Sequence, residues 1–169
     1  MKREITAAEV RALFDYNAED GHLRWRVPRR GQRLGAVAGS VGLNGYRRIS
    51  FWDDGQEKNI CCLAHRLVWL WVHGEWPSTM MDHINMNKDD NRLVNLRLAT
   101  MSQNKSNQRI RKDSKTGFKG VLAKGSGWSA RIQKDGVTHY LGTYPTPEQA
   151  HLAYCNAAKT FHGEFARSV

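Results

Sequence analysis

"MDHINMNKDDNRLVNLRLATMSQN", residues 81–104, is the stretch that decides how the middle of this chain folds. Residues 80–84 and 95–99 are typical of two strands, and the long polar segment between them predicts the tip of a hairpin. Thr100 and Gln103 have the spacing of a capping box, so a helix is expected to begin there. The stretch therefore predicts the order strand, strand, helix.

Side chains suited to phosphodiester hydrolysis stand together in this stretch. Hydrolysis needs a base to activate water and a cation to neutralise the charge that builds on the phosphate. His83 is a competent general base near pH 7, and Asp82 offers a hard carboxylate oxygen of the kind that magnesium prefers. Adjacent residues on a strand point to opposite faces, so we expect Asp82 and His83 to flank a bound phosphate.

Other histidines and asparagines of this region have simpler interpretations. His65 and His73 fall in a segment predicted to be a buried helix, where packing or hydrogen bonding is their expected role. Asn85, Asn87 and Asn91 occupy positions where asparagine commonly serves turn geometry, so we expect them to shape the hairpin tip.

The composition limits the classes of protein to which this chain can belong. The chain has 169 residues, which fits one ordinary domain or two small ones. Its 26 Lys and Arg against 16 Asp and Glu give a net charge of +10, which favours a polyanion as partner. Three cysteines, two of them adjacent, provide neither a disulfide framework nor paired zinc ligands, so no structural zinc is expected and a reducing cytoplasm fits best.

The segment before the hairpin is predicted to be rich in strands. A short helix over residues 6–14 is followed by a strand over residues 22–27, and residues 45–52 and 58–64 form a hairpin. Residues 24–35, "RWRVPRRGQRLG", carry five arginines and no acid. This segment is interpreted either as a solvated loop or as a phosphate contact, for which the candidates are Arg26, Arg29 and Arg30.

The C-terminal part follows a polar, basic break at residues 107–117. Three short strands are expected around residues 118–122, 128–133 and 137–142. A helix then begins after Thr146 as cap, with Pro147 at its first position, and it ends at Gly163. The longest apolar run of the chain has six residues, too few for a membrane span of about 20. The N-terminus lacks the apolar core of a secretion signal.

Four blocks in order, "HRLVW", "DHIN", "DNRLVNLRLAT" and "SQN", resemble the HNH nuclease family over residues 20–108, specifically the homing endonucleases of phages and introns. The resemblance implies a ββα-metal site. In this site Asp82 is a metal ligand, His83 is the general base and Asn95 braces the hairpin loop. Asn104 stands in place of the last histidine as a metal ligand, and the implied divalent ion is magnesium, with manganese as the alternative.

A second resemblance covers residues 114–167. The blocks "GFKGV", "GWSARI", "YLGTYPTPEQAHLAYCNAA" and "HGEFA" are similar to the APETALA2/ethylene-response-factor type of DNA-binding domain. It implies a three-stranded sheet, backed by a helix, that lies in the major groove. Ala130 and Ile132 would face the helix, and Trp128 is expected in the core. The contact positions are Lys119, Lys124, Arg131, Gln133, Thr138 and Tyr140. Leu122, Gln133 and Thr138 replace arginines that are usual in plant relatives.

Together these predictions describe an α+β chain in three parts. Residues 1–108 are an HNH endonuclease domain, with a β-rich part over 1–64 and the HNH core over 65–108. A basic linker over 109–116 leads to the C-terminal module, residues 117–169, with its three-stranded antiparallel sheet packed on one helix.

The predicted function is metal-dependent cleavage of DNA, with a nick in one strand. The expected partner is double-stranded DNA, with no membrane and no obligate protein partner, in the cytoplasm of a bacterium or a phage-infected host. The alternative is a non-catalytic DNA-binding regulator that uses the HNH fold as a scaffold. An RNA-directed nuclease is disfavoured because a sheet cannot enter the deep, narrow major groove of A-form RNA.

Overall fold

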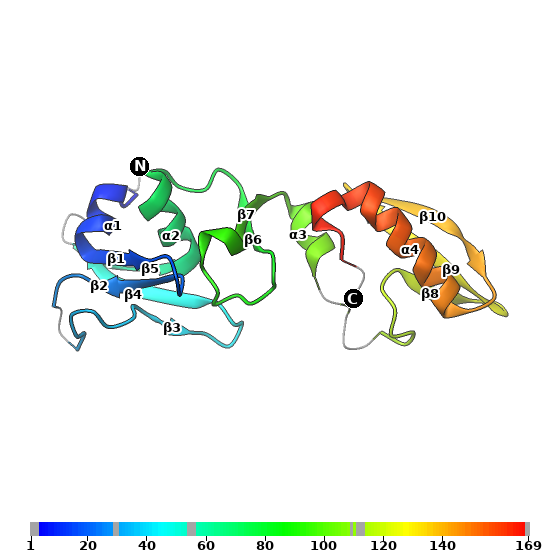
Figure 1. Cartoon of the computed structure of the whole chain (residues 1–169), viewed down its shortest axis with the longest axis horizontal. Helices are drawn as coiled ribbons and strands as arrows, with labels where there is room; N and C mark the ends of the chain where they lie inside the picture. The colour runs from blue at the N-terminus through cyan, green and yellow to red at the C-terminus, as the bar shows by residue number, and fades with distance from the viewer. Residues whose placement is uncertain (1–3, 29–30, 54–56, 109, 111–113, 168–169) are drawn as a thin grey trace. The chain divides into compact units, whose positions relative to one another are not determined.

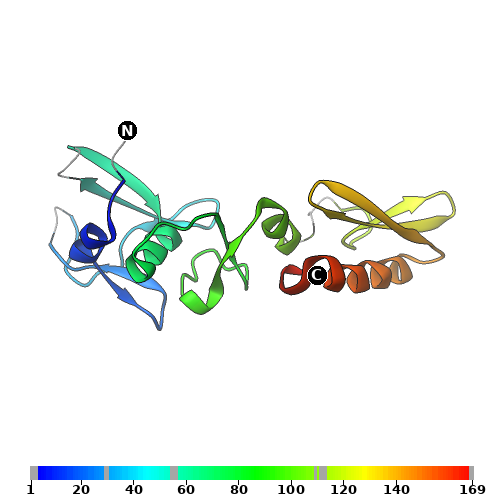
Figure 2. The ribbon, with the colours of Figure 1, turned by 90° about the horizontal axis from the view of Figure 1, so that it is seen from above.

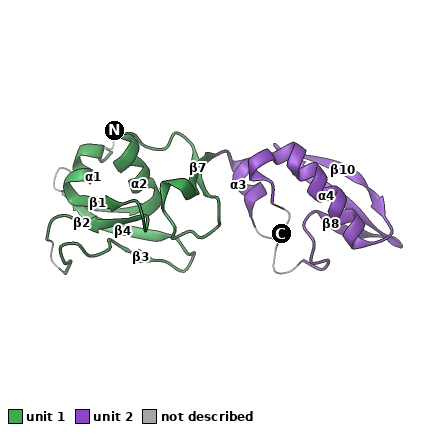
Figure 3. Ribbon diagram, in the orientation of Figure 1, with its two compact units in different colours: residues 1–98 green, residues 99–169 purple. Residues whose placement is uncertain are grey.

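The fold was analysed in a computed structural model of the chain. It describes residues 4–28, 31–53, 57–108, 110 and 114–167. The chain divides into two compact units, residues 1–98 (unit 1) and residues 99–169 (unit 2), which Figure 3 shows in separate colours. Each unit combines small antiparallel sheets or strand pairs with helices, so the predicted α+β class agrees with this mixture of elements.

Unit 1 begins with a capped helix and two small sheets. Thr6 and Glu9 form the predicted capping box at the start of α1, but the helix ends at Leu13, and Phe14 begins a strand instead of completing the helix. The predicted hairpin between β4 and β5 is confirmed by its antiparallel register. The elements are α1 (Ala7–Leu13), β1 (Phe14–Asn17), β2 (His22–Trp25), β3 (Ser40–Val41), β4 (Arg47–Asp53) and β5 (Lys58–Leu63).

The core of unit 1 is built around helix α2 (Ala64–His73). Leu67, Val68 and Leu70 are buried on this helix, and they belong to one apolar cluster with Phe14 and Trp25 from the β1–β2 pair. Gly74 ends the helix in a left-handed conformation, as its position after the apolar run predicts. The helix therefore supports the sheets and places His65 of its first turn in the protein interior.

The predicted order of strand, strand and helix in the middle of the chain is confirmed. β6 (Met80–His83) and β7 (Leu96–Ala99) form a two-stranded sheet, and the short helix η1 (Leu93–Asn95) leads into β7. Thr100 and Gln103 make the expected capping box at the start of α3 (Met101–Asn107). Although α3 follows β7 directly along the chain, its contacts assign it to unit 2.

Unit 2 contains a three-stranded antiparallel sheet in the order β10, β9, β8, with α4 lying along one face (Figures 1 and 2). Ala130 and Ile132 of β9 are buried, and Tyr154 is one of the buried residues on α4. Thr146 caps α4 and Gly163 ends it, as predicted. The elements are β8 (Val121–Lys124), β9 (Gly127–Lys134), β10 (Val137–Tyr144), α4 (Pro147–His162) and η2 (Gly163–Phe165).

The first strand of this sheet begins three residues later than the sequence predicts. Gly120 has φ +72°, and a Cβ atom there would come within 2.1 Å of the Tyr154 ring and 2.5 Å of the Arg131 carbonyl oxygen. The chain at Gly120 thus turns closely over the helix before β8 can start. Trp128 is half-buried and packs against the small apolar cluster that contains Val121, in line with its expected core role. Within the described residues, no helix is long and apolar enough to cross a bilayer.

Candidate active site in the β6–β7 hairpin

His83, at the end of β6, is held by a buried hydrogen bond. Its Nε2 lies 3.1 Å from Oδ1 of Asn91, and both residues are buried, with exposures of 4% and 1%. Nδ2 of Asn91 donates to the carbonyl oxygen of Asp89 at 3.3 Å, which places the amide oxygen toward the histidine. An amide oxygen can only accept, so Nε2 carries the proton, and Nδ1 is the basic nitrogen of the neutral ring.

Two aromatic rings pack near the ring of His83. The ring of His65 meets it edge-on with centroids 5.1 Å apart, and the ring of Tyr46 lies 5.8 Å away. Burial lowers the pKa of His83, although the hydrogen bond to Asn91 and the charge of Asp82 act in the opposite direction. Burial also lowers the pKa of His65 to about 3. Both imidazoles are therefore neutral at pH 7, which is the state that a general base requires.

Asp82 is buried beside an arginine from the neighbouring strand. Its Oδ2 accepts hydrogen bonds from Nε and Nη2 of Arg97 at 3.0 and 2.9 Å. The two side chains are only 6% and 12% exposed. Arg97 thus balances the charge of a carboxylate that would otherwise be costly to bury next to His83.

Asn95 spans the hairpin loop. Its Oδ1 accepts from the backbone N–H of Asn85 at 2.8 Å, and its Nδ2 donates to the carbonyl oxygen of Asp90 at 2.8 Å. Asn85 in turn donates from Nδ2 to Oδ2 of Asp90 at 2.7 Å. These bonds connect the two ends of the loop that carries Asn91, so they fix the position from which Asn91 reaches His83.

Asp90 is the most heavily bonded acid of the loop. Oδ1 accepts from Nε of Arg92 at 2.7 Å and Oδ2 accepts from Nη2 of the same residue at 2.6 Å. The hydrogen bonds from Arg92 are the largest cause that lowers the pKa of Asp90, to about 2. The carboxylate therefore contributes stability to the loop while it is ionised.

The ionisation of Asp90 predicts a loss of stability in acid. The folded pKa of about 2 lies below the ordinary 3.8, and because Arg92 is exposed to solvent the stabilisation is about 1 kcal/mol, which is fully present above about pH 4 and is lost as the pH falls toward 2. An asparagine side chain cannot ionise, so the stability difference between the wild type and Asp90→Asn should shrink over this range. Tryptophan fluorescence during urea unfolding at pH 5, 4 and 3 measures it. An equal difference at all three values would contradict this role of Asp90.

The hairpin tip is also fastened to the neighbouring sheet of unit 1. Arg47 of β4 donates from Nε and Nη2 to the two carboxylate oxygens of Asp89 at 2.8 and 2.9 Å. Lys88 donates to the carbonyl oxygen of Asn44 at 2.9 Å, and its ammonium lies 4.6 Å from the centre of the Tyr46 ring. These contacts hold the hairpin tip against β4 and the residues that precede it.

Asn104, the other predicted metal ligand, lies half-buried on α3 and belongs to unit 2. Asp82 belongs to unit 1, so the distance between these two side chains is not defined. The donor set of one carboxylate and one amide oxygen suits magnesium, which keeps several waters and needs few protein ligands. Within the described ranges, no group of three or more His, Cys, Asp or Glu side chains is gathered for a metal ion.

The structure places most of the predicted DNA contacts on one sheet face in unit 2. Arg131 pairs with Tyr140 across β9 and β10, and Gln133 pairs with Thr138, so these side chains share a face. All four are exposed, and so is Lys124, whose ammonium lies 4.8 Å from the centre of the Tyr140 ring.

Several predicted contacts already have partners within the protein. Oε1 of Gln133 accepts from Nζ of Lys105 at 3.1 Å. Lys119 is half-buried, and its Nζ donates to the carbonyl oxygens of Ser106 and Gln108 at 2.6 and 2.9 Å. Arg26 is exposed but donates to the carbonyl oxygen of Arg11 at 3.2 Å. Arg29 and Arg30 lie outside the described residues.

The residues that surround His83 and Asp82 were not predicted from the sequence. Asn91 was assigned to turn geometry only, and Tyr46, His65 and Arg97 were given no role at the site. The signal for Asn91 was its place inside the block "DNRLVNLRLAT", in which neighbouring positions had already been assigned. Arg97 lies in the same block, whereas Tyr46 gave no comparable signal, because it reaches His83 only through a tertiary contact.

Comparison with known proteins identifies the class of this hairpin. A family model described as HNH endonuclease matches residues 62–106, a range that contains Asp82, His83, Asn95 and Asn104. Residues 62–106, about a quarter of the chain, are therefore similar to HNH endonuclease domains.

A protein of Acanthamoeba polyphaga mimivirus, named as an uncharacterized HNH endonuclease, is 39% identical to this chain over 105 residues. The match covers 60% of this chain and 54% of the viral protein. The chain thus spans about half the length of this curated relative.

Proposed function

We propose that this chain is a metal-dependent DNA endonuclease of the homing type, in which the HNH domain hydrolyses one phosphodiester bond and leaves a nick. The observation that carries the proposal is the state of His83. Its hydrogen bond to Asn91 and its buried setting keep the ring neutral, with Nδ1 as the basic nitrogen. A scaffold domain would not need a buried histidine in a defined tautomer beside a buried carboxylate.

In this mechanism Nδ1 of His83 accepts the proton of the attacking water. Asn91 holds the Nε2 proton, so the ring cannot turn its other nitrogen to the substrate without losing a buried hydrogen bond. Asn95 keeps the loop closed and so maintains the position of Asn91. Asp82 and Asn104 would hold the divalent ion, which supplies charge neutralisation at the phosphate and the leaving oxygen.

Magnesium is the proposed ion, with manganese as the alternative, because both oxygen donors are hard. Oδ2 of Asp82 accepts two bonds from Arg97, an arrangement that fixes the orientation of the carboxylate. Arg97 thereby acts as a positioning residue for Asp82.

The C-terminal module is proposed to be a DNA-binding domain of the APETALA2/ethylene-response-factor type that selects the target. Its exposed sheet face offers hydrogen-bonding side chains of suitable length for base edges in the major groove. The proposed contacts on it are Lys124, Arg131, Gln133, Thr138 and Tyr140. The net charge of +10 supports the same partner, because basic side chains gain affinity by releasing counterions from the phosphates.

The test is cleavage of supercoiled plasmid by the full chain, with magnesium, with manganese and with a chelator. We expect open circles to accumulate before linear DNA when either metal is present, and no cleavage with the chelator. If the plasmid stays supercoiled with both metals while the protein still binds DNA, the endonuclease proposal is wrong and the non-catalytic regulator is favoured. Preferential cutting of RNA would instead contradict the assignment of the substrate.

Asn91 provides a sharper test of the proposed base. Asn91→Leu is similar in size but cannot accept the Nε2 proton, so the ring is free to take the other tautomer. We expect the nicking rate to fall by about 10²-fold, since a wrong tautomer of a catalytic histidine can cost up to about 10⁴. Asn91→Asp keeps an acceptor and should retain more activity than Asn91→Leu.

Nitrogen NMR of His83 supplies a readout of the tautomer itself. The wild type and Asn91→Asp should show a proton on Nε2, whereas Asn91→Leu should show a mixture. A leucine variant that cuts at the wild-type rate would remove Asn91 from the mechanism.

A further inference from the structure

The helix that carries Asn104 is too short and too polar to be stable by itself. α3 has seven residues, with the sequence MSQNKSN. Isolated helices shorter than about 12 residues are marginal in water, so tertiary contacts must supply most of the order of α3. Ser106 and Asn107 are nevertheless buried, at 8% and 7% exposure, which means that polar partners replace the usual apolar face.

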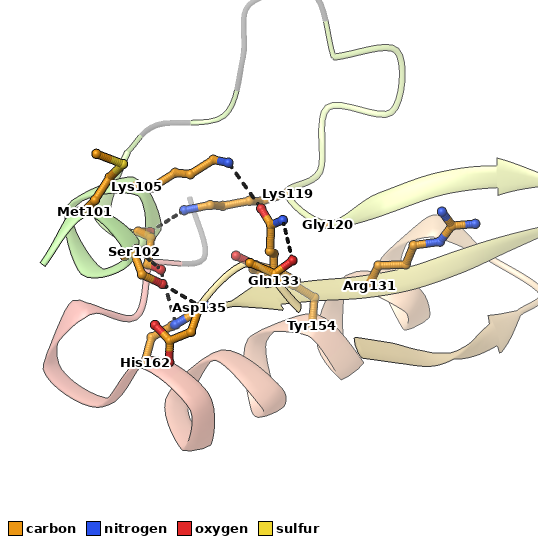
Figure 4. A pocket seen from close by; sticks show the side chains of 12 residues that line it. Met101, Ser102, Lys105, Lys119, Gly120, Arg131, Gln133, Asp135, Tyr154 and His162 are labelled. Atoms are coloured by element: carbon orange, nitrogen blue, oxygen red, sulfur yellow. Dashed lines mark hydrogen bonds between the residues drawn. The ribbon is translucent and has the colours of Figure 1, made fainter. Parts of the chain in front are cut away.

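These contacts come from the C-terminal module, within unit 2. Nζ of Lys105 donates to Oε1 of Gln133 at 3.1 Å, and the backbone N–H of Asp135 donates to Oγ of Ser102 at 3.1 Å. Oγ of Ser106 lies 3.2 Å from Nδ1 of His162 on α4. Figure 4 shows Lys105 of α3, Gln133 of the sheet and His162 of α4 among the residues that line one cavity, which has a volume of about 530 Å³.

Lys119 closes the other end of α3. Its ammonium donates to the carbonyl oxygens of Ser106 and Gln108, which lie in the last turn of the helix and at its C-cap. The last carbonyls of a helix lack intrahelical partners and carry partial negative charge, so a cation at this place stabilises the helix end. Burial and the charge of Arg167 lower the pKa of Lys119 to about 8, so the side chain remains mostly charged at pH 7.

We infer that the C-terminal module orders α3 and so fixes the place of Asn104, a proposed metal ligand, within unit 2. Lys119 is then a positioning residue for a metal ligand. This inference rests on the proposed function for the role of Asn104. It adds a second task to the module, since a domain that only selects DNA would not need hydrogen bonds to the last helix of the HNH motif.

The first test measures the order of α3 directly, in the full chain without metal or DNA. In Lys119→Met we expect amide hydrogen exchange in α3 to accelerate by about tenfold, because a charge-assisted bond at the helix end is lost. Lys119→Met with Ser106→Ala should accelerate it further. Lys159→Met is the matched control, since Lys159 is an exposed lysine on α4 and its loss removes the same charge. Unchanged exchange in the double variant would overturn the inference.

The second test asks whether the order of α3 matters for the metal. In Lys119→Met the magnesium concentration needed for half-maximal nicking should rise by about tenfold, while DNA affinity in chelator stays within about twofold of the wild type. The opposite pattern, with weaker DNA binding and an unchanged metal requirement, would make Lys119 a simple DNA contact and overturn the inference.

The two proposals fail in different ways. If the wild type cuts no DNA with any metal, the proposed function is wrong, whereas hydrogen exchange still decides whether the module orders α3. If the wild type cuts and exchange in α3 accelerates without any change in metal requirement, the nuclease stands and the positioning role is wrong.

Discussion

Replacing His83 by alanine is expected to lower the rate of DNA nicking by about 10²- to 10⁴-fold, the usual contribution of a general base. The loss should appear in the rate at saturating DNA, because the water is activated after the substrate has bound. Gel-shift measurements in chelator should show DNA affinity close to that of the wild type. Free imidazole should restore part of the rate, because the variant leaves a buried space where the ring of His83 lay.

His73→Ala is the control for this variant. His73 is an exposed histidine at the end of α2, with its ring against Trp69, and it lies in the same unit. The His73→Ala variant should cut DNA at the wild-type rate. Equal cutting by His83→Ala would exclude His83 as the base and leave the β6–β7 hairpin without its proposed chemistry.

Replacing Gly21 by alanine is expected to cause a large loss of stability in unit 1. Gly21 has φ +75°, and an added Cβ would come within 2.3 Å of the backbone nitrogen of Arg92 and 2.7 Å of the carbonyl carbon of Asn91. The positive φ costs about 1–2 kcal/mol and the steric conflict about 1–3 kcal/mol more. Because the obstacle is backbone, the loop that carries Asn91 must move, and the nicking rate should fall as well.

Gly35→Ala separates these two causes. Gly35 has nearly the same conformation, with φ +76°, but nothing lies within 4 Å of an added Cβ. The stability of Gly35→Ala should therefore fall only by the free energy that a positive φ costs an alanine, and its activity should be unchanged. Five of the six tryptophans lie in residues 1–98, so tryptophan fluorescence reports unfolding of this unit. Equal losses in the two variants would show that the approach of Gly21 to the hairpin loop does not matter.

Local signals account for the parts of the fold that sequence analysis predicted well. The capping boxes of α1 and α3 involve residues three positions apart, and Gly74 ends α2 through its own backbone conformation. Such features depend on near neighbours along the chain and can be recognised without a fold. The hairpin of β4 and β5 is of the same kind, because its strands are adjacent in sequence.

Features that depend on contacts between distant segments were harder to predict. Phe14 continues the helical pattern in sequence, but it joins β1 because it packs against Trp25 at a ring distance of 4.7 Å. The strand β8 starts late because Gly120 must pass close to Tyr154 of α4, a residue more than thirty positions further along the chain. Tertiary packing outweighed local propensity at both places.

The candidate site also has some features that could be predicted from the sequence and others that could not. Asp82 and His83 could be proposed from the sequence by their residue types, and Asn95 and Asn104 through the family resemblance. The tautomer of His83 could not be predicted, because it depends on which atom of Asn91 faces the ring, and that follows from the bond between Asn91 and the backbone of Asp89.

The sequence by itself thus determined the order of the elements in residues 80–107 and supported a proposal for the chemistry, since residue types and short-range signals are properties of the chain. Only the tertiary structure decided that α3 packs with the C-terminal module and that Lys119 binds the end of this helix. The physical reason is that a short polar helix takes its stability from whichever surface satisfies its hydrogen bonds, and that surface forms only when distant segments have folded together.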